Sequence, residues 1–103
     1  MYQITIVYNH PTDTAAFDDH YEHTHVPLVR AIPDVRAFEL SKCESLDASR
    51  PAAYAIARLS FDDKESAGQA FGSPAGQAAA GDVAGFASGG ATMFFTEQTA
   101  IDL

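Results

Sequence analysis

The chain has few basic residues and no long apolar stretch. Its 103 residues include 6 lysines and arginines against 14 aspartates and glutamates, which gives a formal charge of -8. Such a charge repels nucleic acid and anionic membrane surfaces. No apolar run approaches the roughly 20 residues that span a bilayer, and residues 1–5 lack the basic start and apolar stretch of a signal peptide. We therefore expect a cytoplasmic protein that binds neither nucleic acid nor membranes.

Motifs for covalent chemistry and for cofactors are equally scarce. Cys43 is the single cysteine, so no disulfide can form within the chain, and the sequence shows no base or metal ligand beside it. None of the serines lies in a nucleophile-elbow motif. Gly85, Gly89 and Gly90 do not lead from a strand into a helix, and no glycine-rich loop with a lysine is present. The sequence implies no cofactor.

The residues that are present alternate between strand and helix periodicity. Strict alternation of apolar and polar residues indicates strands, whereas a spacing of three and four residues indicates helices. The expected strands cover residues 2–8, 35–43, 52–61 and 91–100. The expected helices run from residue 12 or 13 to about 32, from 62 or 63 to about 71, and from 73 onward past 83. With no internal linker or repeat, residues 1–103 are expected to form one domain.

This order of elements predicts a ferredoxin-like α+β fold, with a four-stranded antiparallel sheet and helices on one face. The opposite face would carry Val7, Phe38, Ile56 and one of the two aromatic registers at residues 93–95. The sequence leaves that register open. Because a monomer seldom exposes so large an apolar patch, we expect two copies to pack face to face as a homodimer.

A histidine points toward the core from the first expected helix. At about 100° per residue, the apolar stripe of this helix spans an arc of roughly 80°. It consists of Phe17, Tyr21, His25, Leu28 and Ile32. His25 is then either a buried histidine satisfied by a carbonyl or a tyrosine hydroxyl, or an acid/base or ligand-orienting group at the wall of a small-molecule pocket. The sequence is compatible with both.

Three histidines of this helix stand close together in the sequence, but their spacing argues against a metal site. In a regular helix His23 and His25 lie about 160° apart, and His20 falls on the side of His23. Pro27 cannot donate to the carbonyl of His23, so a kink or break is expected at residues 23–26. Unless that kink unwinds the turn, the histidines cannot share one ion. We expect no metal, and we expect Asp82 to be a helix cap or turn residue.

Arg58 stands on the mixed face of the third expected strand, beside Glu39 of the second. It could form a structural cross-strand ion pair with Glu39, or it could hold a carboxylate or enolate of a substrate. We favour the structural pair.

Two groups of motifs, spread over almost the whole chain, carry a family resemblance. The first consists of Tyr21, Thr24-His25-Val26-Pro27-Leu28-Val29, Pro33 and Val35. The second consists of Phe61-Asp62, Ala70-Phe71, Ser73-Pro74, Gln77-Ala78, Asp82-Val83 and Phe86. In this order they resemble the EthD domain, one branch of the dimeric α+β barrel superfamily. The family usually has glycine after the first proline; Asp34 stands there instead and tolerates positive φ well enough for the turn to survive.

The resemblance implies more about shape than about activity. Relatives in the superfamily include cofactor-independent monooxygenases, haem-degrading enzymes, lactone isomerases and polyketide cyclases, and EthD itself accompanies an oxygenase system that degrades a branched alkyl ether. In many of them the substrate lies between the helices and the sheet, where the stripe of the first helix aims His25. Fold alone does not choose among these reactions.

The expectation is therefore an EthD-like protein with a small, largely apolar organic ligand and His25 as its proton-handling group. Tyr21 and Tyr8 would supply hydroxyls, and Phe17, Phe71 and Phe86 the apolar walls. The chemistry would be that of a cofactor-independent oxidoreductase, such as a monooxygenase, or of an isomerase. The alternative is a non-catalytic binding or accessory protein of a degradation pathway.

Overall fold

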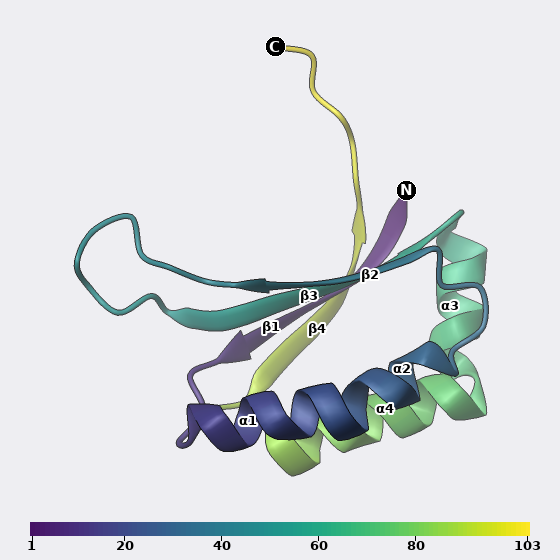
Figure 1. Ribbon diagram of the computed structural model, residues 1–103. Coiled ribbons are helices and arrows are strands. Elements are labelled where there is room, and N and C mark those ends of the chain that lie inside the picture. The colour runs from purple at the N-terminus through teal and green to yellow at the C-terminus, as the bar shows by residue number, and fades with distance from the viewer.

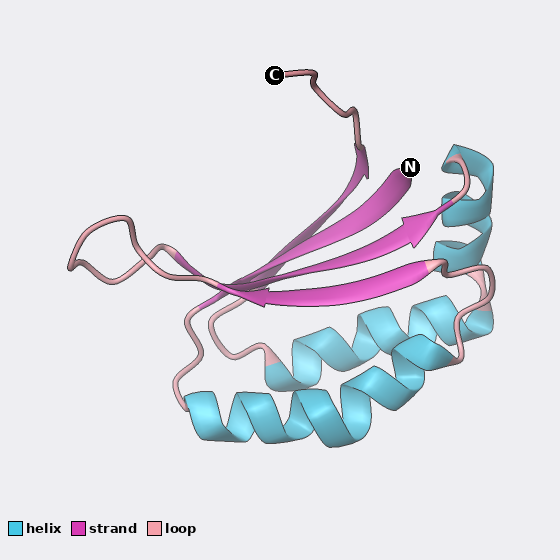
Figure 2. Ribbon diagram, turned by 45° about the horizontal axis from the view of Figure 1, so that its top comes forward, coloured by secondary structure: helices cyan, strands magenta, loops and turns pink.

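A four-stranded antiparallel sheet carries the helices on one of its faces (Figure 1, Figure 2). The computed structural model describes residues 1–103. The strands are β1 (Tyr2–Asn9), β2 (Ala37–Lys42), β3 (Ala53–Phe61) and β4 (Ala91–Glu97), in the spatial order β2-β3-β1-β4. The helical elements are α1 (Thr14–His20), η1 (Tyr21–His25), α2 (Val26–Arg30), α3 (Lys64–Gly72) and α4 (Pro74–Phe86). This is the predicted ferredoxin-like α+β fold.

Polar side chains start the helices where the sequence indicated. Asp13, Asp63 and Ser73 each accept a hydrogen bond from the backbone N–H three residues ahead, at 3.0, 2.8 and 3.0 Å. Each side chain satisfies a donor that a helix start leaves unpaired. Asp34 has a φ of 64°, so the turn after Pro33 keeps its shape without glycine. None of the helices combines the length and the apolar character that crossing a bilayer requires.

The first helix contains a π turn, η1, between the α-helical segments α1 and α2. The backbone N–H of Val26 donates to the carbonyl of Tyr21, five residues back. Pro27 explains the change, because it has no N–H for the carbonyl of His23 and its ring would crowd that oxygen in a regular helix. The irregularity predicted at residues 23–26 is confirmed, and it takes the form of a widened turn.

The register of the strands decides which side chains face the helices. Ile4, Ile6 and Tyr8 of β1 face the helices, whereas Gln3 and Thr5 point to the other side, which we call the open face. The register left open by the sequence is settled by the β1–β4 pairing. Phe94 lies opposite Thr5 and belongs to the open face, while Met93 and Phe95 lie opposite Ile6 and Ile4 on the helix side.

The expectation that Phe38 belongs to the open face is wrong. Phe38 lies opposite Leu59 in the β2–β3 pairing, and Leu59 is buried beneath the helices. The ring of Phe38 accordingly lies 6.4 Å from that of Tyr21 on the helical side. Residues opposite each other in a ladder share a face of the sheet. The pairing of β2 with β3 therefore determines where this ring points, because the alternation within β2 does not show which of its two sides faces the helices.

The open face is more polar at its centre than expected. Gln3 donates to Ser60 at 3.1 Å, and the hydroxyls of Thr5 and Thr96 are 2.7 Å apart. Arg58 stands opposite Glu39 in the ladder, as predicted, but the two side chains form no ion pair within 4 Å. The favoured structural pair is therefore absent, although the register that suggested it is correct.

Candidate active site

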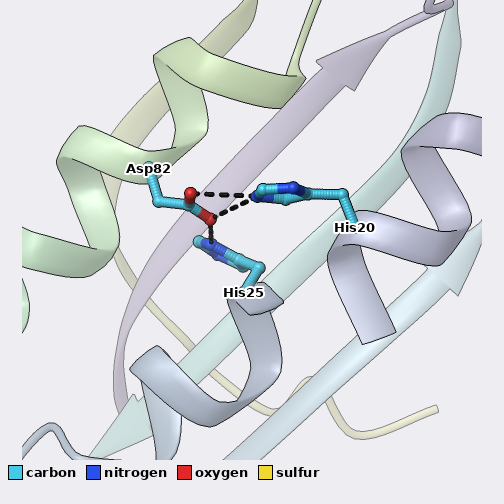
Figure 3. A network of polar contacts seen from close by, with 3 residues as sticks. All are labelled: His20, His25 and Asp82. Carbon is cyan, nitrogen blue, oxygen red and sulfur yellow. Dashed lines mark hydrogen bonds and ion pairs between the residues drawn. The ribbon is translucent and has the colours of Figure 1, made fainter. Parts of the chain in front are cut away.

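His25 lies in η1 with its ring buried and held by a carboxylate from another helix. The residue is only 4% exposed, and its Nδ1 lies 3.0 Å from Oδ2 of Asp82 in α4 (Figure 3). His20, at the end of α1, approaches the same carboxylate, with its Nε2 2.9 Å from Oδ1 and 3.0 Å from Oδ2. Two imidazoles from one helix thus converge on one carboxylate of another.

The π turn makes this convergence possible. Residues five apart in a regular α-helix point about 140° away from each other, which would place His20 and His25 on different sides. A π turn pairs each N–H with the carbonyl five residues back, so it brings His20 and His25 toward the same side. Pro27 therefore influences the site although it does not touch the carboxylate.

The proton positions in this cluster follow from its chemistry. An ionised carboxylate can only accept hydrogen bonds, so the Nδ1 of His25 donates to Asp82. Burial lowers the pKa of His25, and His20 lowers it further, whereas the hydrogen bond and the charge of Asp82 raise it in part. At neutral pH the ring is therefore uncharged. Its Nε2 carries a lone pair and has no hydrogen-bond partner in the protein, as a general base requires.

His25 also lines a cavity of about 40 Å³ between the helices and the sheet. The other walls are the side of β1 that faces the helices, the buried side of α4 and the α3–α4 corner. The residues that line the cavity together with His25 are Ile4, Ile6, Tyr8, Val29, Ile32, Leu59, Ala70, Phe71, Gly76, Ala79, Ala80, Val83 and Met93. His25 is the only group of this lining that titrates near neutral pH, and Tyr8 contributes the only hydroxyl. The cavity is an apolar space with one base and one phenol.

Two tyrosine hydroxyls near His25 are buried and interact only with each other. Tyr8 is 0% exposed and Tyr21 is 4% exposed, and neither hydroxyl has a partner elsewhere in the protein, whereas the interaction between them contributes to the pKa of both. Their ring centroids are 5.9 Å apart, and the ring of Tyr21 lies 5.1 Å from that of His25. Burial raises the pKa of both tyrosines. Both hydroxyls therefore keep their protons and remain available as hydrogen-bond donors.

The structure gathers the predicted site residues into one region, in two layers. Tyr8, His25 and Phe71 line the cavity itself. The remaining three pack behind them and do not reach the cavity: Phe17, Tyr21 and Phe86. The ring of Phe86 lies 4.9 Å from that of His25 and 5.1 Å from that of Phe17. This second layer holds the rings of the first in place.

Two residues of the cluster were not expected from the sequence. Asp82 is not a cap or turn residue but lies inside α4, and His20 turns toward Asp82 and not to the side of His23. His23 instead contacts the carbonyl and carboxylate of Asp19 on the exposed side. The signal that could have identified Asp82 is its isolation, because it is the only charged residue in the sequence of α4.

The cluster is a hydrogen-bonded arrangement rather than a ligand set. The ring nitrogens of His20 and His25 that approach Asp82 lie 2.9 to 3.0 Å from its oxygens. No group of three or more histidine, cysteine or acidic side chains in residues 1–103 is arranged to hold a metal ion. The absence of a metal in the protein remains a prediction, which elemental analysis can test.

Comparisons with known proteins agree with this architecture. A sequence model of the EthD domain matches residues 9–90. The chain is 60% identical over 101 residues to an uncharacterized 11.0 kDa protein from the thcB-thcC intergenic region of Rhodococcus erythropolis, covering 98% of each chain. A crystal structure of an ethyl tert-butyl ether D (EthD) family protein from Bacillus halodurans superposes with a TM-score of 0.90 at 31% identity, covering 96% of this chain and 99% of that one.

A more distant structural relative has the same fold at low sequence identity. It is a dimeric ferredoxin-like protein of unknown function from Thermobifida fusca, with a TM-score of 0.69 and 13% identity, and the match covers 94% of this chain and 90% of that one. At this identity the likeness concerns the fold alone.

Proposed function

This chain belongs to the EthD domain family, and we propose that it binds or transforms a small, largely apolar organic molecule in the cavity between its helices and its sheet. One observation carries the proposal: an uncharged histidine, held by a carboxylate through Nδ1, lines an otherwise apolar cavity. A buried imidazole that needed only a partner for its own stability would not require a cavity beside it. The combination of an apolar pocket with a few polar groups is typical of small-molecule sites.

The acid/base step would be carried by His25. Its Nε2 takes a proton from an acidic carbon or hydroxyl of the bound molecule, and the carboxylate of Asp82 stabilises the imidazolium that forms. Proton transfer by a positioned histidine accelerates reactions typically about 10²- to 10⁴-fold. Return of the proton to another atom would be an isomerisation, and the same deprotonation activates a substrate for cofactor-independent oxidation.

A second candidate function is non-catalytic binding, as in an accessory protein of a degradation pathway. It is favoured by the lining itself, because twelve of the 14 residues around the cavity are hydrophobic. Such walls hold an apolar molecule by burial alone.

A ring-sized ligand requires the cavity to open further than its 40 Å³. Met93 lines the cavity and is 40% exposed, so it lies at the opening toward solvent. Its side chain is unbranched and adaptable, and Phe71 beside it is also partly exposed. Movement of these two side chains would admit a ligand without disturbing the strands.

Titration of ¹⁵N-labelled protein with methylenecyclohexane tests binding. We expect saturable shifts of the amide signals of Val29, Ala79 and Val83, which line the cavity. Ala79→Leu fills the space and should abolish the shifts, whereas Ala84→Leu, on the exposed side of the same helix, should retain them. Absence of any saturable shift in the unaltered protein would contradict the proposed function.

Hydrogen exchange separates the catalytic from the binding function. Deuterium uptake at the carbons beside the carbonyl of cyclohexanone, followed by NMR in D₂O, reports proton abstraction without knowledge of the natural substrate. We expect the protein to accelerate this deuterium uptake. The acceleration should fall about 100-fold in His25→Asn and persist in His23→Asn, because the imidazole of His23 is exposed. Binding of the probes without acceleration would identify a carrier rather than an enzyme.

We also propose that a second copy covers the open face. Phe94 is 45% exposed there, and Val7 and Ile56 are partly exposed beside it. The C-terminal residues 98–103 project on the side of the sheet opposite to the helices (Figure 1), with Ile101 75% exposed. The fold is shared with a ferredoxin-like protein described as dimeric. Two such faces packed together would remove these apolar groups from water.

A further inference from the structure

The buried hydroxyls of Tyr8 and Tyr21 carry information about the ligand. Buried polar groups nearly always have a hydrogen-bond partner, and exceptions need an explanation. These two hydroxyls belong to adjacent side chains, one of them 0% and the other 4% exposed; they interact with each other, and neither has a partner elsewhere in the protein. When one of the two donates to the other, the remaining O–H still lacks an acceptor, and a phenylalanine would fill that position without leaving a donor unsatisfied. The remaining donor is explained if its partner comes from outside the protein.

Both hydroxyls belong to the same cluster as His25. Tyr8 lines the cavity together with His25. Tyr21 packs between them, with its ring 5.9 Å from that of Tyr8 and 5.1 Å from that of His25. A molecule that enters the cavity and contacts the imidazole therefore lies beside Tyr8 as well, with Tyr21 behind it.

The charges around the cavity restrict its ligand to uncharged molecules. Asp82 is ionised when it accepts from His25, and its charge opposes further negative charge at Tyr8. An anionic ligand would meet the same opposition. A cation would lose its hydration among aliphatic walls, and the one carboxylate nearby, that of Asp82, is already engaged with His20 and His25. Because both tyrosines keep their protons, what they lack is a hydrogen-bond acceptor.

We propose that the ligand is an uncharged, mainly apolar carbonyl compound, and that the hydroxyl of Tyr8 donates to its oxygen. The hydroxyl of Tyr21, which interacts with that of Tyr8, would donate to Tyr8 from behind, because a phenol oxygen can accept while its O–H donates. This inference rests on the proposed function of the cavity and specifies the class of molecule that it takes.

The same arrangement would serve enolisation. The Nε2 of His25 takes a hydrogen beside the carbonyl as a proton, the C–H electron pair forms the carbon–carbon double bond, and the carbonyl π pair moves to the oxygen. The hydroxyl of Tyr8 stabilises the negative oxygen, and Asp82 stabilises the imidazolium. No oxidant or further reactant is needed, because the proton returns to the enolate in the product.

The test compares two probes that differ only at one position. Cyclohexanone carries C=O where methylenecyclohexane carries C=CH₂ on the same ring. The measured quantity is the ratio of the two affinities, determined by amide-shift titration of the whole chain. Loss of this hydrogen bond should lower the ratio about five- to tenfold in Tyr8→Phe. Tyr21→Phe removes the hydroxyl behind that of Tyr8 and should lower the ratio by less. The matched control is Tyr54→Phe, whose hydroxyl donates to Asp18 at the surface, and it should leave the ratio unchanged.

A measurement on the unaltered protein makes the test independent of the variants. The infrared C=O stretch of bound ¹³C-labelled cyclohexanone should lie below its position in cyclohexane solution, as hydrogen bonding to the oxygen requires. A stretch at the hydrocarbon-solvent position, or an affinity ratio that Tyr8→Phe leaves unchanged, overturns the inference while the cavity still binds apolar molecules. If neither probe binds, the proposed function fails and this inference fails with it.

Discussion

His20 and His25 stand five residues apart along one helix and hydrogen-bond to the same carboxylate, that of Asp82 (Figure 3). The side chain of His20 is 34% exposed and that of His25 only 5% exposed, so the cluster reaches from the surface to the cavity. Its geometry depends on the π turn that Pro27 imposes. A proline that would ordinarily weaken a helix here brings two imidazoles to one acceptor.

Asp82→Asn should release His25 from its fixed tautomer. An asparagine oxygen accepts only weakly in place of the carboxylate, and its amide group can turn toward His25 instead. We expect ¹⁵N NMR of the imidazole to change from the Nδ1-protonated form to a mixture of tautomers, with a loss of about 1–3 kcal/mol in the free energy of unfolding. Asp18→Asn, which alters an exposed carboxylate beside Lys42, should cost less than about 1 kcal/mol. An unchanged His25 spectrum would show that Asp82 does not position the ring.

The stability of the protein should fall as the pH drops below about 6.5. Burial lowers the pKa of His25 from its ordinary value of 6.5, so the unfolded chain binds a proton at this residue that the folded chain does not. Stability therefore rises with pH across the window between the folded and unfolded pKa values. The groups that face His25 are Asp82 and His20, with Tyr21 and Tyr8 protonated beside it.

The measurement is the free energy of unfolding by urea at several pH values between 5 and 7.5. His25→Asn should flatten the decline on the acid side. His23→Asn should leave the decline in place, because that exposed histidine has its pKa raised by Asp19 and contributes with the opposite sign. An equal slope in wild type and His25→Asn would mean that His25 is not held neutral by the fold.

Light scattering at micromolar concentration should give about twice the 11.0 kDa mass of the chain. Phe94→Glu places a charge in the middle of the open face and should shift the protein to a monomer, because burying an unpaired carboxylate is unfavourable. Leu46→Glu, in the fully exposed loop between β2 and β3, is the matched control and should stay dimeric. A stable monomer of the unaltered chain would contradict the face-to-face dimer.

Elemental analysis of protein purified without a tag should find no stoichiometric zinc, iron or copper. The Nε2 of His20 and the Nδ1 of His25 are already engaged with the carboxylate of Asp82, and a metal bound at these atoms would have to displace those hydrogen bonds. One ion per chain would show that the cluster rearranges into a ligand set.

The order of strands and helices follows from the sequence because periodicity and helix caps are local. The alternation in β1, the caps at Asp13, Asp63 and Ser73 and the disruption by Pro27 each depend on residues within a few positions of one another. The inward direction of His25 follows in the same way from its place in an apolar stripe. Such local signals do not depend on how the rest of the chain folds.

Tertiary structure decided which distant residues Phe38, His20 and His25 contact. The face taken by Phe38 depends on the β2–β3 register, and the convergence of His20 and His25 on Asp82 depends on how α4 packs against η1, 57 residues further along the chain. The cavity and the buried hydroxyls of Tyr8 and Tyr21 likewise exist only where helices and sheet meet. Local periodicity fixes the direction of a side chain relative to its own helix or strand. Residues that are distant in the sequence meet only when one element packs on another, and this packing minimises the exposed apolar surface of the whole fold.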